Sequence, residues 1–172
     1  MRSPKSRLAA LTALVALPTA ALAYTAVAPY PSTVTATTYY SSGTYHGAVD
    51  VANSRCNYWG AETGVSATVY WNVTVRTSGV VCNGNGSGNQ NEALLNLGSG
   101  WSFRQWHWIK TSDSYDRTCN RCQVGNLGGT GNATGAHSHF QKDQYGTKNT
   151  SWYSSYTSKG EALDRGELMG YI

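Results

Sequence analysis

Residues 65–75, VSATVYWNVTV, alternate apolar and polar side chains without a break. Successive side chains of a β-strand point to opposite faces of a sheet, whereas a helix repeats about every 3.6 residues. The period of two therefore predicts a strand with one buried face. That face would carry Val65, Ala67, Val69, Trp71, Val73 and Val75.

The rest of the chain indicates the same fold class. β-branched and aromatic residues are frequent, and glycine-rich stretches occur at 83–89 and 125–135. No long stretch combines helical periodicity with helix caps. The glycines of 125–135 do not fit the G-x-G-x-x-G pattern of dinucleotide-binding proteins. We therefore predict a mostly β protein built on an antiparallel sheet.

The first 23 residues have the pattern of a secretory signal peptide. Three basic residues come first, an apolar run follows, and residues 21–23 fit a small-residue cleavage site. The run is short and interrupted for a bilayer span. We predict a signal peptide at 1–23, an extended lead-in at 24–38, a single domain at 39–172, and a secreted or periplasmic, extracellular location.

The predicted signal peptide carries most of the positive charge. The whole chain has a formal net charge of +4. Three basic residues and no acidic residue lie in 1–23, so the exported chain carries about +1. It has no cluster of lysine and arginine that would attract nucleic acid or anionic lipid. We expect no nucleic-acid partner, no membrane attachment after signal cleavage, and a monomer.

Four cysteines in an exported chain predict two disulfides, and three pairings are possible. We favour Cys56 with Cys82, and Cys119 with Cys122. Alternatively, the CNRC segment at 119–122 could be a redox pair or half of a zinc knuckle. A structural bridge is favoured, because no βαβ pattern surrounds the segment and no second CxxC occurs.

The chain contains four histidines, and their spacing is informative. His46 and Asp50 are four residues apart, which puts both side chains on one face of a strand or of a helix. His137 and His139 are two apart, a spacing that shares a face only on a strand. An antiparallel neighbour could therefore bring His46 and Asp50 opposite the histidine pair. The fourth histidine is His107.

Two imidazoles and one carboxylate suit Zn²⁺, which in catalytic sites leaves its fourth position to water. The chain lacks H-E-x-x-H, so a histidine would have to take the proton of an attacking water. Either histidine pattern alone is more often an ordinary surface or hydrogen-bonded histidine. The two together, in a chain with few histidines, favour a metal site.

Three segments carry a resemblance to a known family. YHGAVDVA (45–52) and LGGTGNATGAHSHF (127–140) resemble the two signatures of the lysostaphin-type zinc metallopeptidases, the LytM-like peptidoglycan endopeptidases. Between them, LLNLGSGWSFRQWHWIK (94–110) is similar to the family's middle segment. The resemblance covers roughly residues 39–141 and implies a single lysostaphin-type peptidase domain.

The resemblance implies a role for each histidine. His46, Asp50 and His139 would bind zinc, and His137 would be the general base. His107 would orient water or stabilise the tetrahedral intermediate. These assignments account for all four histidines of the chain.

The resemblance also implies a groove on the sheet, walled by loops, that receives an extended peptide. Tyr40 would be the tyrosine that some relatives direct at the oxyanion, and Tyr39 is the competing choice. The sequence departs from the family at QWHW, where a tyrosine-x-histidine is common. Residues 53–93 match poorly and are interpreted as an insertion that reshapes the groove.

Three function hypotheses remain from the sequence. The first is an exported zinc metalloendopeptidase that cuts peptide bonds in peptidoglycan stem peptides or cross-bridges. The second is a catalytically inert secreted β domain whose aromatic residues bind cell-wall glycan or a protein partner, with SWYSSYTS (151–158) as the predicted exposed aromatic surface. The third is a structural zinc site, which is usually closed by four protein ligands.

Overall fold

A computed structural model describes residues 23–172, so the predicted signal peptide lies outside the described residues except for its last one. The regular structure of residues 23–172 consists of strands, without a helix. The strands are β1 (Thr25–Val27), β2 (Ser32–Ala36), β3 (Val49–Ala52), β4 (Gly60–Glu62), β5 (Val69–Thr74), β6 (Glu92–Gly98), β7 (Trp101–Trp106), β8 (Arg117–Cys119), β9 (Gln123–Asn126), β10 (His137–Gln144), β11 (Thr147–Asn149), β12 (Ala162–Leu163) and β13 (Leu168–Tyr171).

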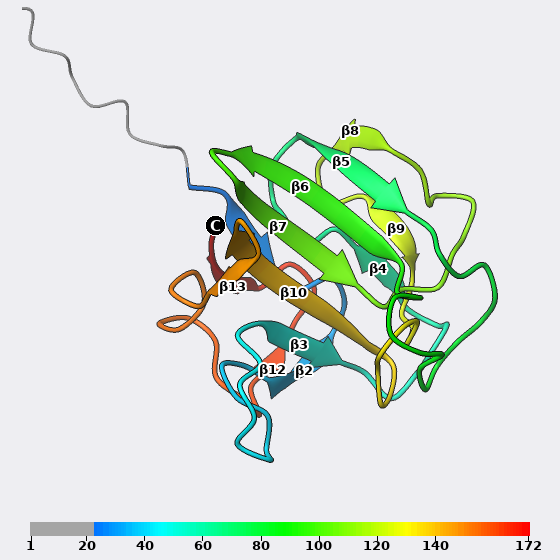
Figure 1. Ribbon diagram of the computed structural model, residues 1–172, viewed down its shortest axis with the longest axis horizontal. Helices are drawn as coiled ribbons and strands as arrows, with labels where there is room; N and C mark the ends of the chain where they lie inside the picture. The colour runs from blue at the N-terminus through cyan, green and yellow to red at the C-terminus, as the bar shows by residue number, and fades with distance from the viewer. Residues whose placement is uncertain (1–22) are drawn as a thin grey trace, which may run out of the picture.

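One nine-stranded sheet organises the molecule, with the order β12-β2-β3-β10-β7-β6-β5-β8 and β11 paired with β10. Every strand pairing among the described residues is antiparallel. Figure 1 shows β6, β7 and β10 as long neighbouring strands, with β3, β2 and β12 continuing the sheet. The predicted fold class, mostly β with an antiparallel sheet, is confirmed.

Two small sheets complete the fold, β1 with β13 and β4 with β9. The segment 24–38, predicted as an extended lead-in, contains β1 and β2. β2 pairs with β3 inside the large sheet, and β1 pairs with β13 near the end of the chain. The backbone N–H of Tyr24 donates to the carbonyl of Ile172 at 3.0 Å. The lead-in residues are therefore hydrogen-bonded to the rest of the fold at both ends.

The alternating stretch 65–75 has the predicted faces, because its apolar positions are buried or half-buried and Trp71 is fully buried. The strand itself is shorter, since β5 begins at Val69. Val65 forms an isolated bridge with Ala26 of β1 instead. Residues 65–68 therefore lie outside the large sheet, and the chain joins that sheet only at Val69.

One face of the large sheet forms the apolar core. Phe103 of β7 and Phe140 of β10 stack with ring centroids 6.0 Å apart, and Trp152 meets Phe103 edge-on at 5.3 Å. Trp152 and Tyr153 are buried, so the prediction of an exposed aromatic surface at 151–158 is wrong for both. The segment packs against β13, where Tyr171 N–H donates to the carbonyl of Trp152 at 2.9 Å. The opposite face of β3 and β10 is left for polar side chains.

Cys56 is bonded to Cys82 and Cys119 to Cys122, which are the pairings favoured from the sequence. The first bridge lies in the segment 53–93, and this segment contacts the loop before β10. Gly129 N–H donates to the carbonyl of Val81 at 2.8 Å. The segment is thereby attached to the polypeptide that leads into the histidine pair.

No helix among residues 23–172 is long and apolar enough to cross a membrane.

Candidate metal centre

The pairing of β3 with β10 brings the predicted metal ligands together. In the register of the two strands, His139 lies opposite Asp50. His139 Nδ1 is 2.9 Å from Asp50 Oδ1, and His46 Nε2 is 3.1 Å from His139 Nδ1. His46 Nε2 is also 3.2 Å from Asp50 Oδ1. Three possible ligand atoms, one from each residue, thus converge at one point.

The hydrogen bonds on the outer side of each ring define what faces this point. His46 Nδ1–H donates to the carbonyl of Thr37 at 2.7 Å. His139 Nε2–H donates to Gln141 Oε1 at 3.3 Å. In a neutral imidazole the other nitrogen is an acceptor, so His46 Nε2 and His139 Nδ1 both present lone pairs to Asp50. Three buried acceptors without a donor between them favour a bound cation.

The spacing and chemistry of the three atoms fit zinc. Zn–N and Zn–O bonds of about 2.0–2.2 Å place tetrahedral ligand atoms about 3.3–3.5 Å apart, close to the observed separations. His46, Asp50 and His139 are 1%, 5% and 4% exposed. Three protein ligands leave one tetrahedral position open, as in catalytic zinc sites and unlike four-ligand structural sites. The residues present therefore suit a catalytic zinc ion.

The charge states of the ligands agree with this role. Burial alone would raise the pKa of the Asp50 carboxyl, but hydrogen bonding to His139 and His46, and the positive charge of a ring when it is protonated, hold that pKa well below its ordinary value. Asp50 is therefore anionic at neutral pH, as a metal ligand has to be. Burial lowers the pKa of His139, which favours the neutral, metal-binding imidazole.

His137 lies two residues before His139 on the same face of β10 and is half-buried. Its Nδ1–H donates to the carbonyl of Gly135 at 2.9 Å. Its Nε2 is 3.7 Å from Asp50 Oδ1, farther than the three converging atoms are from one another. The nitrogen facing Asp50 is thus free to accept a proton beside the metal position.

His107 reaches the same place from the end of β7. Its ring centroid lies 4.6 Å from that of His137, and its Nδ1–H donates to the carbonyl of Thr130 at 2.6 Å. Burial lowers the pKa of His107 to about 3, and the nearby His137 and His139 add to that effect. His107 is therefore neutral at neutral pH, with Nε2 as an acceptor.

The backbone of His107 has φ of 80°, a left-handed conformation that is costly for a residue with a side chain. Two hydrogen bonds hold it: His107 N–H donates to the carbonyl of Asn91 at 3.1 Å, and Thr130 N–H donates to the carbonyl of His107 at 3.0 Å. The surrounding backbone thus fixes a strained residue at the candidate site.

Asn91 is a residue that reasoning from the sequence missed. It is fully buried, and its side-chain amide is completely hydrogen-bonded. Oδ1 accepts from the N–H groups of Arg76 and Thr77 at 2.8 and 2.9 Å. Nδ2 donates to the carbonyls of Thr77 and Trp108 at 2.8 and 2.9 Å. Asn91 therefore links the segment 53–93 to the polypeptide that carries His107.

Of the two tyrosine candidates, Tyr40 is the one at the site. Its ring lies 4.3 Å from that of His46, and it lines a pocket with Asp50 and His137. Burial and the charge of Asp50 raise the pKa of Tyr40, so its hydroxyl stays protonated. Tyr39 does not line the pocket and packs against the ring of Tyr45 at 5.8 Å.

The pocket over the metal position has a volume of about 540 Å³. Its walls include His107, His137 and the loop 132–136. Asp50 lines it as well, so the pocket reaches the candidate metal ligands. The arrangement is a cavity that is walled in part by a loop and lies beside the candidate metal ligands.

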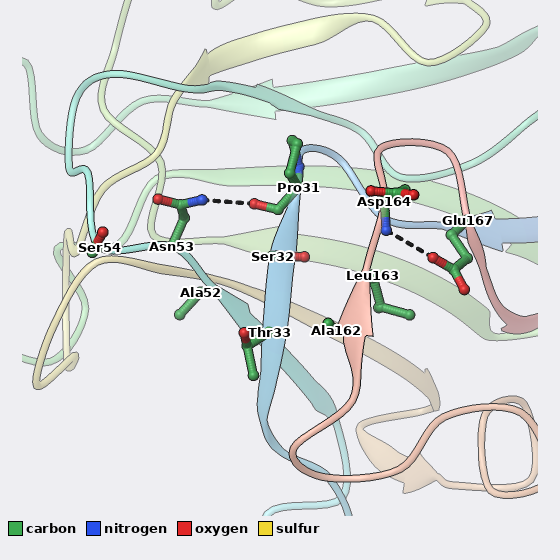
Figure 2. A pocket seen from close by; sticks show the side chains of 10 residues that line it. All are labelled: Pro31, Ser32, Thr33, Ala52, Asn53, Ser54, Ala162, Leu163, Asp164 and Glu167. Carbon is green, nitrogen blue, oxygen red and sulfur yellow. Dashed lines mark hydrogen bonds between the residues drawn. The ribbon is translucent and has the colours of Figure 1, made fainter.

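A second depression, of about 780 Å³, lies beside the first and shares Ala52 with it. Figure 2 shows its sides, with Asn53 bonded to the carbonyl of Pro31 on one side and Asp164 bonded to Glu167 on the other. Across the strands, the register runs from His137 to Ala52, Thr33 and Ala162. These residues make a continuous row, named here the cross-strand row, from the site to the edge of the sheet.

Comparisons with known proteins give limited likenesses. No family model and no curated protein matches the chain. Among solved structures, a zinc-containing peptidase from Vibrio cholerae is similar at 20% identity and a TM-score of 0.45, over 73% of this chain and 39% of the peptidase chain. A chain in the complex of SpoIIIAH and SpoIIQ is similar at 14% identity and a TM-score of 0.41, over 73% of this chain and 93% of that one. Neither likeness assigns an activity to this protein.

Proposed function

We propose that the protein is an exported zinc metalloendopeptidase that hydrolyses peptide bonds in bacterial peptidoglycan, in stem peptides or in cross-bridges. The observation that carries the proposal is the convergence of three buried possible ligand atoms, His46 Nε2, Asp50 Oδ1 and His139 Nδ1, which lie 2.9–3.2 Å from one another. These three residues hold the zinc, which when bound polarises a scissile carbonyl and activates water.

The other residues of the pocket supply proton transfer and orientation. His137 accepts the proton of the attacking water at Nε2, because its Nδ1–H is already committed to the carbonyl of Gly135. His107 accepts a hydrogen bond from the same water at Nε2 and so orients it. The Nε2 of a neutral ring whose Nδ1 carries the proton can accept a hydrogen bond but cannot donate one to an oxyanion. The protonated hydroxyl of Tyr40 donates to the oxygen that becomes negatively charged.

The substrate class is supported by the resemblance of residues 45–52 and 127–140 to the signatures of peptidoglycan endopeptidases. It is also supported by the shape of the site. The pocket over the ligands and the second depression share Ala52 in their linings, and side by side they leave room for an extended peptide.

The direct test is digestion of purified peptidoglycan by the chain lacking residues 1–23. We expect new amino and carboxyl termini in the released fragments, detected by mass spectrometry, loss of release with a chelator, and recovery when zinc is restored. Zinc-loaded protein that binds peptidoglycan or a protein partner but releases no fragment would contradict the proposal and favour the inert binding module instead.

A further inference from the structure

Polar side chains continue beyond His139 along the face of β10 that carries the metal ligands. Gln141 and Asp143 follow at spacings of two residues and are only 5% and 2% exposed. On the neighbouring strand β7, Arg104 lies opposite Gln141 and Ser102 lies opposite Asp143. Buried polar groups are costly unless they are hydrogen-bonded, so these side chains are expected to bond to one another or to their neighbours.

The hydrogen bonds of Gln141 run in one direction. His139 Nε2–H donates to Gln141 Oε1 at 3.3 Å, and Gln141 Nε2–H donates to Asp143 Oδ2 at 3.2 Å. A carboxylate only accepts hydrogen bonds, so the amide nitrogen must face Asp143 and the amide oxygen must face His139. The proton of the neutral His139 ring is thereby directed to Nε2, which leaves the lone pair of Nδ1 pointing at the metal position.

Asp143 is held in turn by groups on β7. Arg104 Nε lies 3.0 Å from Asp143 Oδ2, and Arg104 Nη2 and Ser102 Oγ donate to Asp143 Oδ1 at 3.3 and 3.1 Å. The charge of the buried carboxylate is therefore compensated. Its position is fixed by two strands.

The same network also contacts the face of the His139 imidazole ring. Arg104 Nη1 pairs with Glu92 Oε2 at 3.1 Å, and Glu92 Oε2 accepts from Trp106 Nε1–H at 2.6 Å. The indole of Trp106 stacks on His139, with centroids 4.8 Å apart and planes 9° apart. His139 is thus constrained both at its outer nitrogen and across its ring.

We propose that Gln141, oriented by Asp143 and Arg104, is a positioning residue that fixes the tautomer and ring orientation of His139 for metal binding. The inference rests on the proposed zinc site and adds to it the residues that prepare one ligand. Partners of the outer nitrogen of a metal-binding histidine typically contribute 10- to 100-fold to metal affinity or activity.

The test is the zinc affinity of variants, measured by competition with a chromophoric chelator. Gln141→Leu removes the acceptor of the His139 proton while keeping a buried side chain of similar size. We expect its zinc affinity to fall by about 10- to 100-fold. The absorption spectrum of the Co²⁺-loaded variant should also change, because the geometry at His139 is altered.

Gln105→Leu is the matched control. Gln105 is fully buried on β7, but its Nε2 donates to Ser138 Oγ on the opposite face of the sheet. The same substitution there should leave zinc affinity within about twofold, whatever its effect on stability, since the hydrogen bond of Gln105 goes to Ser138 and not to a candidate metal ligand. Equal losses of zinc affinity in Gln141→Leu and Gln105→Leu would overturn the inference.

A double variant, Gln141→Glu with Asp143→Asn, restores the pattern with the two groups exchanged. The new carboxylate accepts from His139 Nε2–H and from the new amide, so zinc affinity should return to within about tenfold of the unaltered protein. If Gln141→Leu does not fold, this variant decides alone, and a larger loss in the folded double variant overturns the inference. An unaltered protein that binds zinc no better than His46→Ala overturns the proposed function together with the inference.

Discussion

Two residues apart on one strand, His137 and His139 have the same side chain and different hydrogen bonds. His139 turns its Nδ1 toward Asp50 because its Nε2–H is directed at Gln141. His137 turns its Nε2 toward the site because its Nδ1–H is directed at the carbonyl of Gly135. The hydrogen-bond acceptor on the outer side of each ring therefore decides which nitrogen faces the site, and so distinguishes the candidate ligand His139 from the candidate base His137.

This division predicts different outcomes for two alanine substitutions. His137→Ala should keep zinc bound and lower kcat by about 10²- to 10⁴-fold, the usual contribution of a general base. Asp50→Ala should lose both zinc and hydrolysis, since it removes the anionic ligand. Metal analysis after gel filtration and a peptide-hydrolysis assay check both. Equal zinc loss in the two variants would contradict the assignment.

Tyr40 and Tyr39 form a natural pair for testing the oxyanion donor. Tyr40→Phe should lower kcat by about 10²-fold without a change in zinc content, because a lost donor to the oxyanion costs about that much. Tyr39→Phe should be nearly neutral, since Tyr39 does not line the pocket. Steady-state kinetics on one peptide substrate compare them. A larger loss from Tyr39→Phe would reverse the assignment.

At the scale of elements, β10 positions most of the site, because it pairs with β3, which carries Asp50, and with β7, which leads into His107. The alternation in 65–75 and the two-residue spacing of the histidine pair were sufficient to predict strands and shared faces, since both depend on local geometry. The support of the site was harder to predict. The side chain of Asn91 has its role only through partners farther along the chain, such as the carbonyl of Trp108. Gln141 bonds to His139 and Asp143 on its own strand, but Arg104, which fixes Asp143, comes from β7.

The aromatic segment 151–158 shows the same limit in another form. Its composition suggests an exposed surface, but Trp152 and Tyr153 are buried beside β13, where Tyr171 N–H donates to the carbonyl of Trp152, while Tyr156 is exposed. The poor match of 53–93 to the peptidase family likewise gave no sign of its contact with the loop before β10. Long-range pairing, which single-sequence patterns do not encode, accounts for both differences.

The support that Asn91 gives to the end of β7 can be measured. Asn91→Leu should lower the free energy of unfolding by about 3 kcal/mol, because buried backbone groups left unpaired cost about 1–3 kcal/mol each. It should also lower kcat, since His107 loses its fixed position. Urea denaturation of the chelator-treated proteins gives the comparison. Asn89→Leu, at an exposed position in the same region, should change stability by less than about 0.5 kcal/mol.

For the molecule as a whole, hydrogen bonds and a disulfide between residues far apart in sequence stabilise a fold of short strands. Tyr24 and Ile172 exchange backbone hydrogen bonds, and the disulfide of Cys56 with Cys82 connects residues 26 apart in sequence. The other disulfide connects residues only 3 apart. Cross-links restrict the unfolded chain more when they close longer loops, so the two bridges should contribute unequally.

Replacing Cys56 and Cys82 together by serine should cost about 3.5 kcal/mol of unfolding free energy, against about 2 kcal/mol for Cys119 and Cys122 together, from loop-closure entropy. Denaturant titration of both double variants measures the difference. The first variant should also lose activity, since that bridge secures the segment that holds Gly129. A larger stability loss from the shorter loop would contradict this ordering.

Under the proposed function, the cross-strand row from His137 through Ala52 and Thr33 to Ala162 would set the length of peptide that the protein binds. Neighbouring strands lie about 4.8 Å apart, so the row is about 14 Å long, and an extended peptide advancing about 3.4 Å per residue covers it with about four residues. In a series of synthetic peptides lengthened on one side of the cleaved bond, kcat/KM should climb until about the fourth residue and then level off. Under the proposed function, such an enzyme would cut short peptide fragments poorly and would act mainly on the longer peptides of an intact polymer.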